Sequence, residues 1–501
     1  MKRIISILLV MVLLIGLMTA CGGQTETSDG NTAQNVGDNK EAGNTKKEEP
    51  YNITLLIKTL EDDESAQEVM EKINEAALRD LNMTVTVVQA SLANANNQAQ
   101  LMLSSAEDLD VLVMAGQNLP SYVDARYLIN LNDYDLSGVE SVLGKDLIDG
   151  TRTSADELYM LTTVREHFGC RAIYFRKDIC DELGIDVSTV KTLDDLDPIF
   201  EKVKQAYPTM DMIGSNIDII YRGASDSLSD YVGVLNNSQE PVVGNLWDNE
   251  FLQYACGKMY EWNQKGWLRS DMATSNESFQ SIFGAGNTFA MFDGYKPDSL
   301  VEKKNQTGYD CYVAPLTDPS MSTTNLNAVG YAVARNSKNP EKAVEFLNWM
   351  YTSAEFNNLI NWGIEGVDYE VIDAKNGVID YPEGVDGTTV NYHVALGYAF
   401  PNQGAMYVWN GTAPDIWDQY AALEATAVKS VALGFMPDST DWLNEYAACN
   451  AVTEKYKASL LAGAVDPAVY IPQLNEELYA AGLQTIIDMK QAQLDAWLEN
   501  K

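Results

Sequence analysis

Histidine and positive charge are both scarce in this 501-residue chain. There are two histidines, His167 and His393, so His-ligated metal sites and Ser-His hydrolysis have few residues to draw on. Thirty-four lysines and arginines stand against 72 aspartates and glutamates, which gives a formal net charge of −38 at pH 7. Such a chain repels phosphate backbones and anionic lipid surfaces. We therefore exclude a nucleic-acid partner and expect any membrane association to need a specific anchor.

The common catalytic and phosphate-binding motifs are also lacking. The sequence holds no GxSxG, HExxH, GxxxxGK[ST] or GxGxxG, and the pair Gly284 and Gly286 has no third glycine at the required spacing. The Asn- and Asp-rich residues 130–138 do not keep the spacing of a calcium loop. Acidic residues are too numerous for a glycosidase pair to be chosen. We predict no catalytic residue, no metal and no cofactor, and hence a protein that is not an enzyme.

Cysteine usage excludes two further classes of protein. Beyond Cys21 the chain has five cysteines, an odd number at long spacings and without a CxxC pair: Cys170, Cys180, Cys256, Cys311 and Cys449. This pattern is neither a disulfide framework nor a zinc site. We expect most of these residues to be small buried apolar side chains, with one bridged pair left open.

The N-terminus has the features of an export segment. Two basic residues precede a largely apolar run at 4–18, and small residues then lead to Cys21. The run is shorter than the ~20 residues that span a bilayer as a helix. It resembles a bacterial lipoprotein signal with Cys21 as the acylated residue, and an uncleaved anchor is the alternative. Lipid-modified in this way, the protein would be held at the outer face of the cell membrane through the lipid anchor only.

Two series of strands and helices follow a polar stretch, residues 22–50, that we predict to be a disordered linker. Apolar strand-length runs alternate with amphipathic helical segments, first at 53–58, 65–77, 84–88, 92–103 and 110–114. A second series begins at 170–175 and 177–183, and continues with 212–214, 218–221, 251–265, 288–292, 328–334 and a helix from 339. Over residues 51–130 this order predicts a parallel sheet covered on both faces, and the last hundred residues are largely helical. The fold class is α/β, with two lobes and a helical C-terminal region.

Ligands of open parallel sheets bind beyond the carboxyl ends of the strands. Polar and aromatic side chains that suit sugar hydroxyls and sugar faces stand at these places or in loop-like sequence. The candidate substrate-binding residues are Glu61, Asp62, Gln117, Asn118, Arg165, Glu166, Tyr221, Tyr295, Trp362 and Trp409. Trp262 and Trp267 are expected in the core, His167 at the cleft edge or surface, and His393 in a structural role.

Several stretches resemble bacterial extracellular solute-binding lipoproteins of ABC sugar importers. The first are residues 171–178 (RAIYFRKD) with 183–186 (LGID), residues 289–295 (FAMFDGY), and residues 327–343. Residues 361–369 (NWGIEGVDY), 433–436 (LGFM), 466–467 and 480–498 resemble a subgroup with a long C-terminal domain of unassigned function. The resemblance covers residues 51–501.

The resemblance implies a two-lobe periplasmic-binding-protein-like fold of type II, like that of maltose-binding protein. It implies lobe-to-lobe crossings near 168–171 and 314–316. The expected organisation is a signal peptide at 1–21, a linker at 22–50, an N-terminal lobe at 51–169 and 317–375, and a C-terminal lobe at 170–316 and 376–501. The implied function is capture of a carbohydrate, expected to be an oligosaccharide, by a monomer that delivers it to ABC permease subunits. A carbohydrate-processing enzyme at the cell surface and a sugar sensor subunit are the alternatives.

Overall fold

The computed structural model describes residues 49–59, 66–91, 94–105, 107–153, 155–217, 225–275, 277–387 and 389–500. The predicted signal peptide, with Cys21, and the linker up to residue 48 lie outside the described residues, as do Glu61, Asp62 and Tyr221. The predicted strand at 218–221 also lies outside them. Within the described ranges, no helix is long and apolar enough to cross a membrane.

The first sheet has the strand order β2-β1-β3-β12-β4. Its strands are β1 (Tyr51–Thr59), β2 (Met83–Ser91), β3 (Val111–Met114), β12 (Gly330–Val333) and β4 (Leu161–Thr162). Strand β1 pairs in parallel with β2 and β3, whereas β12 runs antiparallel to β3 and β4. The strands predicted at 53–58, 84–88 and 110–114 are confirmed.

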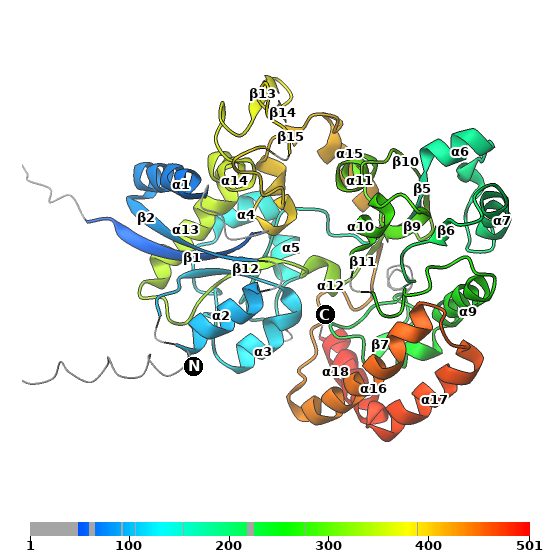
Figure 1. Cartoon of the computed structure of the whole chain (residues 1–501). Helices are drawn as coiled ribbons and strands as arrows, with labels where there is room; N and C mark the ends of the chain where they lie inside the picture. The colour runs from blue at the N-terminus through cyan, green and yellow to red at the C-terminus, as the bar shows by residue number, and fades with distance from the viewer. Residues whose placement is uncertain are drawn as a thin grey trace, which may run out of the picture. The chain divides into compact units, whose positions relative to one another are not determined.

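Helices cover both faces of this sheet (Figure 1). One face packs against α1 (Ala66–Leu81), α4 (Ser137–Leu143), α5 (Lys145–Asp149), α13 (Pro340–Thr352) and α14 (Ala354–Trp362). The other face packs against α2 (Ala95–Ser104) and α3 (Leu119–Asp124). The predicted start of α13 is confirmed, because the Asn339 side chain accepts a hydrogen bond from the Lys342 amide and Pro340 opens the helix.

The second sheet has the order β10-β5-β9-β6. Its strands are β5 (Arg171–Arg176), β6 (Asp211–Ile213), β9 (Thr288–Gly294) and β10 (Cys311–Pro315). Around it lie α6 (Lys177–Leu183), α7 (Leu196–Ala206), α9 (Glu250–Gln264), α10 (Phe279–Gly284) and α11 (Ser299–Thr307), with a hairpin of β7 (Val234–Leu235) and β8 (Val243–Gly244). Trp262 and Trp267 are buried in its core, as predicted.

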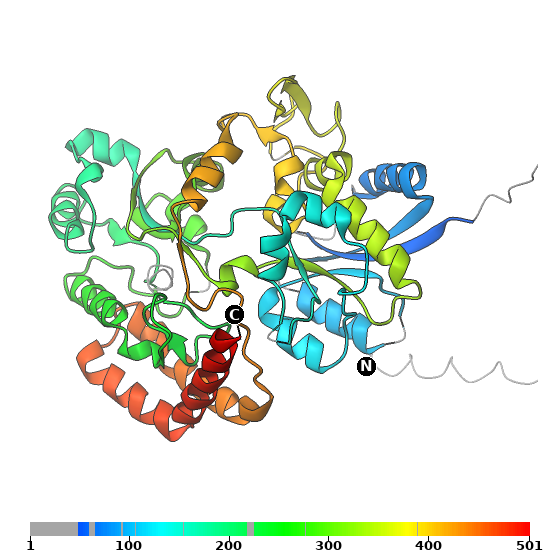
Figure 2. The same ribbon diagram turned by 180° about the vertical axis from the view of Figure 1, so that it is seen from behind.

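Three C-terminal helices extend the core of the second lobe (Figure 2). They are α16 (Leu443–Leu461), α17 (Pro467–Ala480) and α18 (Leu483–Glu499). Residues such as Leu460, Leu474 and Ile486 share one buried cluster with Trp262. Gly482 separates α17 from α18, because its φ of 105° is a conformation that side chains disfavour. The stretch that we predicted to be largely helical therefore contains these three helices.

The segment between α14 and the C-terminal helices differs from the predicted domain boundaries. It forms β13 (Glu370–Asp373), β14 (Val378–Asp380), β15 (Val408–Trp409) and α15 (Ile416–Glu424). We expected residues 376–501 in the second lobe, but side chains between Tyr392 and Met406 pack in the core of the first sheet. The side-chain amide of Asn402 holds this stretch there, because its Nδ2 donates to the Tyr351 carbonyl oxygen at 2.7 Å.

Within the described residues the chain crosses between the lobes three times, and the third crossing lies later than the predicted boundary at 375/376. Gly169 pairs with Ser320 where the two predicted crossings lie side by side. Strand β11 (Ser320–Met321) also pairs with β16 (Val428–Lys429), beyond which the chain enters the second core at Ala432. A short helix, α12 (Thr323–Leu326), follows β11. Three chain segments therefore connect the lobes.

The five described cysteines and His167 are all buried. All five cysteines between Cys170 and Cys449 are buried and free, as the apolar interpretation expected, and the open possibility of a bridged pair is not realised. His167 was expected at the cleft edge or surface, and this was wrong. It is 2% exposed, and its amide donates to a Glu424 carboxylate oxygen at 3.0 Å.

Candidate functional site

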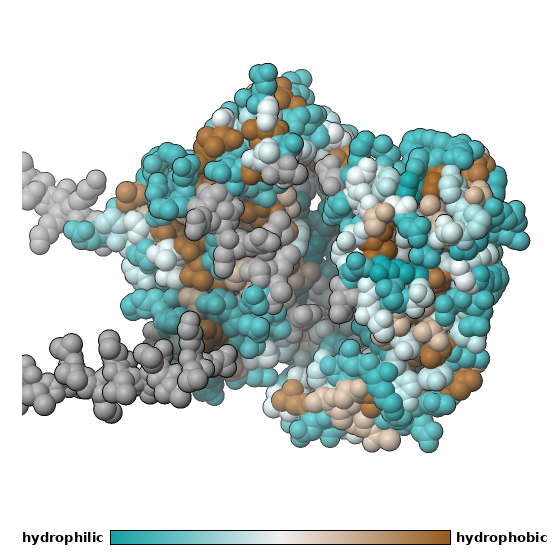
Figure 3. Space-filling view, in the orientation of Figure 1, coloured by the Kyte–Doolittle hydropathy of each residue, from teal (hydrophilic) through white to brown (hydrophobic). Residues whose placement is uncertain are grey.

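A cavity of about 690 Å³ lies between second-lobe residues at the start of α11 and the segment that runs from α14 to α15. The space-filling view is hollowed between the two bodies of the molecule (Figure 3). This volume falls within the usual range of small-molecule sites. The second lobe contributes Lys296, Asp298, Val301, Glu302 and Gln306, and the longer segment contributes residues from Asn361 to Tyr420.

One side of the cavity, which we call the aromatic wall, consists of Trp362, Tyr381, His393 and Trp409. The ring centroids of Trp362 and Trp409 are 5.3 Å apart, and Tyr381 stands edge-on to Trp409 at 4.5 Å. His393 lies 5.1 Å from Trp362 and 4.8 Å from Trp409. Four rings packed in this way hold one another in place, so they present rigid apolar area at little entropic cost.

Local structure positions the two tryptophans. Trp362 is the last residue of α14, and its indole NH donates to the Tyr407 carbonyl oxygen at 3.1 Å. Gly363 follows with a φ of 91°, which turns the chain out of the helix. Trp409 lies on β15, opposite Ile379 of β14. A helix end and a strand thus bring together two residues far apart in the sequence.

Several polar atoms around the aromatic wall have no hydrogen-bond partner among the described residues. They are Asn361 Oδ1, His393 Nδ1 and Gln403 Oε1. Asn361 is only 1% exposed, so its unsatisfied oxygen carries a desolvation cost. Burial lowers the pKa of His393 to about 4, so its ring is neutral at physiological pH. All three residues also line the cavity.

The lining residues from the second lobe include a charged group, which we call the charged wall: Lys296, Asp298 and Glu302. The Lys296 ammonium lies 3.1 Å from a Glu302 oxygen and 3.7 Å from an Asp298 oxygen. Burial alone would lower the pKa of Lys296, but the two carboxylates outweigh it and the pKa is raised. The Tyr420 hydroxyl donates to Asp298 at 2.6 Å, which ties α15 to this wall.

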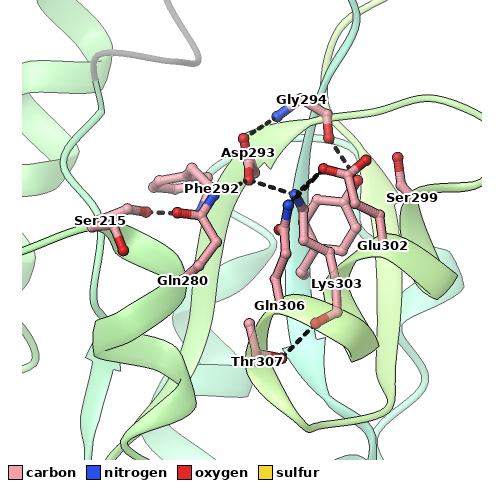
Figure 4. Close-up of polar contacts among 12 residues, drawn as sticks. Ser215, Gln280, Phe292, Asp293, Gly294, Ser299, Glu302, Lys303, Gln306 and Thr307 are labelled. Atoms are coloured by element: carbon pink, nitrogen blue, oxygen red, sulfur yellow. Dashed lines mark hydrogen bonds and ion pairs between the residues drawn. The ribbon is translucent and has the colours of Figure 1, made fainter. Parts of the chain in front are cut away.

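A buried lysine helps to fix Glu302 in place (Figure 4). Lys303, 5% exposed along its side chain, lies 2.8 Å from Asp293 and 3.3 Å from Glu302. Gln306 donates to Glu302 at 2.8 Å, and Gln280 donates to Asp293 at 2.9 Å. Burial by itself raises the pKa of Glu302. The ammonium groups of Lys296 and Lys303 lower this pKa by more than burial raises it, so the net shift is downward and the carboxylate is ionised. The charged wall is therefore held in one geometry.

The predicted site residues fall into three groups. Trp362 and Trp409 line the cavity. Arg165 and Glu166 do not line it but are close enough that Glu166 helps to raise the pKa of Lys296. Tyr295 packs in a small core beside Phe168 and Ile416, and Asn118 ends a short 3-10 helix; neither is a lining residue. The side chain of Gln117 is not among the described ones.

Sequence reasoning missed most of the other lining residues. Tyr295 was selected after a predicted strand, but the next residue, Lys296, was not. Lys296 is the first residue of the charged wall. Tyr381, His393, Tyr407, Trp417 and Tyr420 stand in a segment without helical or strand periodicity. Its aromatic content was the signal available there, and it led to Trp409 alone.

The described residues hold no group of three or more His, Cys, Asp or Glu side chains that could bind a metal ion. The site offers apolar rings, amide and carboxylate oxygens and one ammonium. Such a set can bind a polyhydroxylated molecule by stacking and hydrogen bonding.

Comparisons with known proteins agree with this arrangement. A family model described as "Bacterial extracellular solute-binding protein" matches residues 68–367, and one described as "Domain of unknown function (DUF3502)" matches residues 431–499. A "Carbohydrate ABC transporter substrate-binding protein" of Streptococcus pneumoniae serotype 4 is 24% identical over 415 residues, which are 78% of this chain and 82% of that protein.

Solved structures share the fold. The N-glycan transport solute binding protein NgtS of Streptococcus pneumoniae is 19% identical with a TM-score of 0.81, over 90% of this chain and 99% of that one. NgtS has also been solved with Man1GlcNAc and with Man5GlcNAc. An extracellular solute-binding protein of Bifidobacterium longum subsp. infantis is 15% identical with a TM-score of 0.62, over 90% and 99% of the two chains.

These likenesses confirm the predicted two-lobe fold of type II, with its helical C-terminal region. They also confirm the resemblance found in the sequence, including the C-terminal domain of unassigned function. Because the first family model spans more than half of the residues, this chain belongs to the bacterial extracellular solute-binding protein family.

Proposed function

We propose that this protein captures an oligosaccharide in the cavity between its lobes and delivers it, unchanged, to the permease of an ABC importer. In this role it is a monomer at the outer face of the cell membrane, held there by a lipid on Cys21. The family, the curated relative named as a carbohydrate ABC transporter substrate-binding protein, and the oligosaccharide complexes of NgtS support the proposal.

The observation that carries the proposal is the pairing of two unlike walls around one cavity. Trp362 and Trp409 offer ring faces on which the apolar side of a sugar can stack. Asp298 and Glu302 line the same cavity from the second lobe, and a carboxylate can accept hydrogen bonds from two neighbouring hydroxyls. A sugar ring has both kinds of surface, so it can satisfy both walls at once.

Capture between two lobes gives the mechanism its selectivity. The aromatic wall is attached to the first sheet through α14 and the Asn402 contact, whereas the charged wall precedes and begins α11 in the second lobe. A ligand that contacts both walls favours the closed arrangement, because only that arrangement supplies the full set of contacts. The closed form is then the state that the permease recognises.

Isothermal titration calorimetry against a panel of oligosaccharides, Man1GlcNAc and Man5GlcNAc included, tests the proposal. We expect saturable heat with at least one member and quenching of the cavity tryptophans. Mass spectrometry of the recovered ligand should show an unchanged mass, whereas a carbohydrate-processing enzyme would change it. No binding of any member by calorimetry and fluorescence would contradict the proposal.

The anchor is tested separately from binding. Cys21→Ala expressed in a Gram-positive host should move the protein from the membrane fraction to the medium, because one acylated cysteine is the attachment we propose. Retention of the variant on the membrane would contradict the anchor and leave the binding proposal intact.

A further inference from the structure

The cavity has more negative than positive charge on its surface. Its lining residues include one ammonium, Lys296, and two carboxylates, Asp298 and Glu302. Both carboxylates lie within 4 Å of the single ammonium, so that its charge is already neutralised. His393 adds no positive charge, because its ring is neutral at physiological pH.

Two cations outside the lining, Lys303 and Arg165, already have acidic partners. Lys303 is shared between Asp293 and Glu302. Arg165 lies 3.6 Å from a Glu166 oxygen, and its terminal nitrogen donates to the Asn325 carbonyl oxygen at 2.7 Å. A carboxylate on a ligand would therefore meet further carboxylates, and the rest of the molecule, with its net charge of −38, adds a repulsive field.

We propose that the cavity selects uncharged oligosaccharides and rejects those that carry a carboxylate, with Asp298 and Glu302 as the residues that set this selectivity. The inference rests on the proposed function, since it names the class of ligand for the same cavity. A site can gain specificity by repelling the wrong ligand as well as by attracting the right one. Neutral hydroxyls can donate to both carboxylates, whereas an ionised acid has no proton to donate there.

Matched ligand pairs test the inference. Each pair has a neutral oligosaccharide and a counterpart in which primary alcohols are replaced by carboxylates: β-1,4-mannotriose and β-1,4-trimannuronate, and Man5GlcNAc and its C6-oxidised form. For each pair with a neutral member that binds, we expect the acid to bind at least about tenfold more weakly at low salt. Raising the salt concentration to 0.5 M should reduce this ratio of neutral to acidic affinity, which we call the gap, because ions screen the repulsion.

Two variants assign the effect to the charged wall. Glu302→Gln and Asp298→Asn keep the size and hydrogen-bonding oxygen of the side chain but remove one charge beside Lys296. We expect each to narrow the gap between neutral and acidic members severalfold. Glu345→Gln is the control, because Glu345 pairs with Lys342 on α13 and is not a cavity residue. It should leave the gap unchanged, and melting curves verify that all three variants are folded.

The outcomes separate this inference from the proposed function. Binding of an acid as tight as or tighter than its neutral partner would overturn the inference and leave the proposed function standing. A gap that persists unchanged in both folded charged-wall variants would also overturn it. Absence of binding for every neutral and acidic member would remove the proposed function, and the inference with it.

Discussion

The two walls of the cavity differ in composition, in origin and in what supports them. The aromatic wall comes from residues 362–409, contains no ionised group and is held by ring packing on the first lobe. The charged wall comes from seven consecutive positions, 296–302, and is held by a buried lysine of the second lobe. The aromatic wall supplies contact area, and the charged wall supplies hydrogen-bond acceptors at fixed positions. Affinity and selectivity should therefore respond to different substitutions.

The largest expected effect comes from breaking the aromatic wall. Trp409→Ala removes a ring that contacts Trp362, Tyr381 and His393, and thus both a stacking surface and the support of its neighbours. We expect affinity for a bound oligosaccharide to fall about 100-fold, close to 2.7 kcal/mol. Calorimetry measures the loss.

Two matched variants sharpen this expectation. Trp409→Phe keeps an aromatic face and should recover most of the affinity. Tyr479→Ala removes an exposed ring from α17, away from the cavity, and should change nothing. Equal affinities of wild type and Trp409→Ala would show that the aromatic wall does not bind the ligand.

A smaller effect, on stability, comes from undermining the charged wall. Lys303→Met leaves Asp293 and Glu302 without their shared ammonium, although Glu302 keeps Lys296. Breaking a buried ion pair is costly, and allowing for the remaining partner we expect a loss of about 2 kcal/mol in the free energy of unfolding. Urea denaturation followed by circular dichroism measures it.

The adjacent lysine is the control for this substitution. Lys304 pairs with Asp310 on the surface, where both side chains are more than half exposed. Lys304→Met should cost no more than about 0.5 kcal/mol, because solvent screens such pairs. If the two variants lost the same stability, burial of Lys303 would not be what supports the wall.

The two walls also differ in how far they could be predicted from the sequence. Most strands of the two sheets, β10 excepted, and the helix from Pro340 followed from apolar periodicity and capping chemistry, and the loop after β9 led to within one residue of Lys296. Local patterns of this kind are set by neighbours in the chain, so the sequence displays them directly.

The aromatic wall depends on contacts over long sequence separations. Trp362 and Trp409 were both selected, but nothing local indicates that they meet, or that His393 and Tyr381 complete the cluster. The misplacement of residues 392–406 in the second lobe has the same cause, because the Asn402 to Tyr351 hydrogen bond that anchors them spans 51 residues. His167 was misjudged since its burial depends on α15, more than 240 residues later.

The smallest expected effect is that of pH on affinity. His393 on the aromatic wall has a pKa lowered to about 4 by burial, and the pKa of Glu302 on the charged wall is lowered by its two lysines. Neither group changes charge between pH 8 and 6, so we expect affinity for a neutral oligosaccharide to vary less than about twofold there.

Below pH 6, His393 determines the direction in which its own contribution to folding stability changes with pH. Its pKa lies below the ordinary value of 6.5, so the unfolded chain takes up the proton first. The stability that neutral His393 contributes is complete above pH 6.5 and is lost as the pH falls towards 4. Calorimetry and melting from pH 8 to 4, repeated with His393→Gln, should show that the variant retains more of its stability over this acidic range. An affinity that changed steeply near pH 7 would mean that a group outside both walls controls binding.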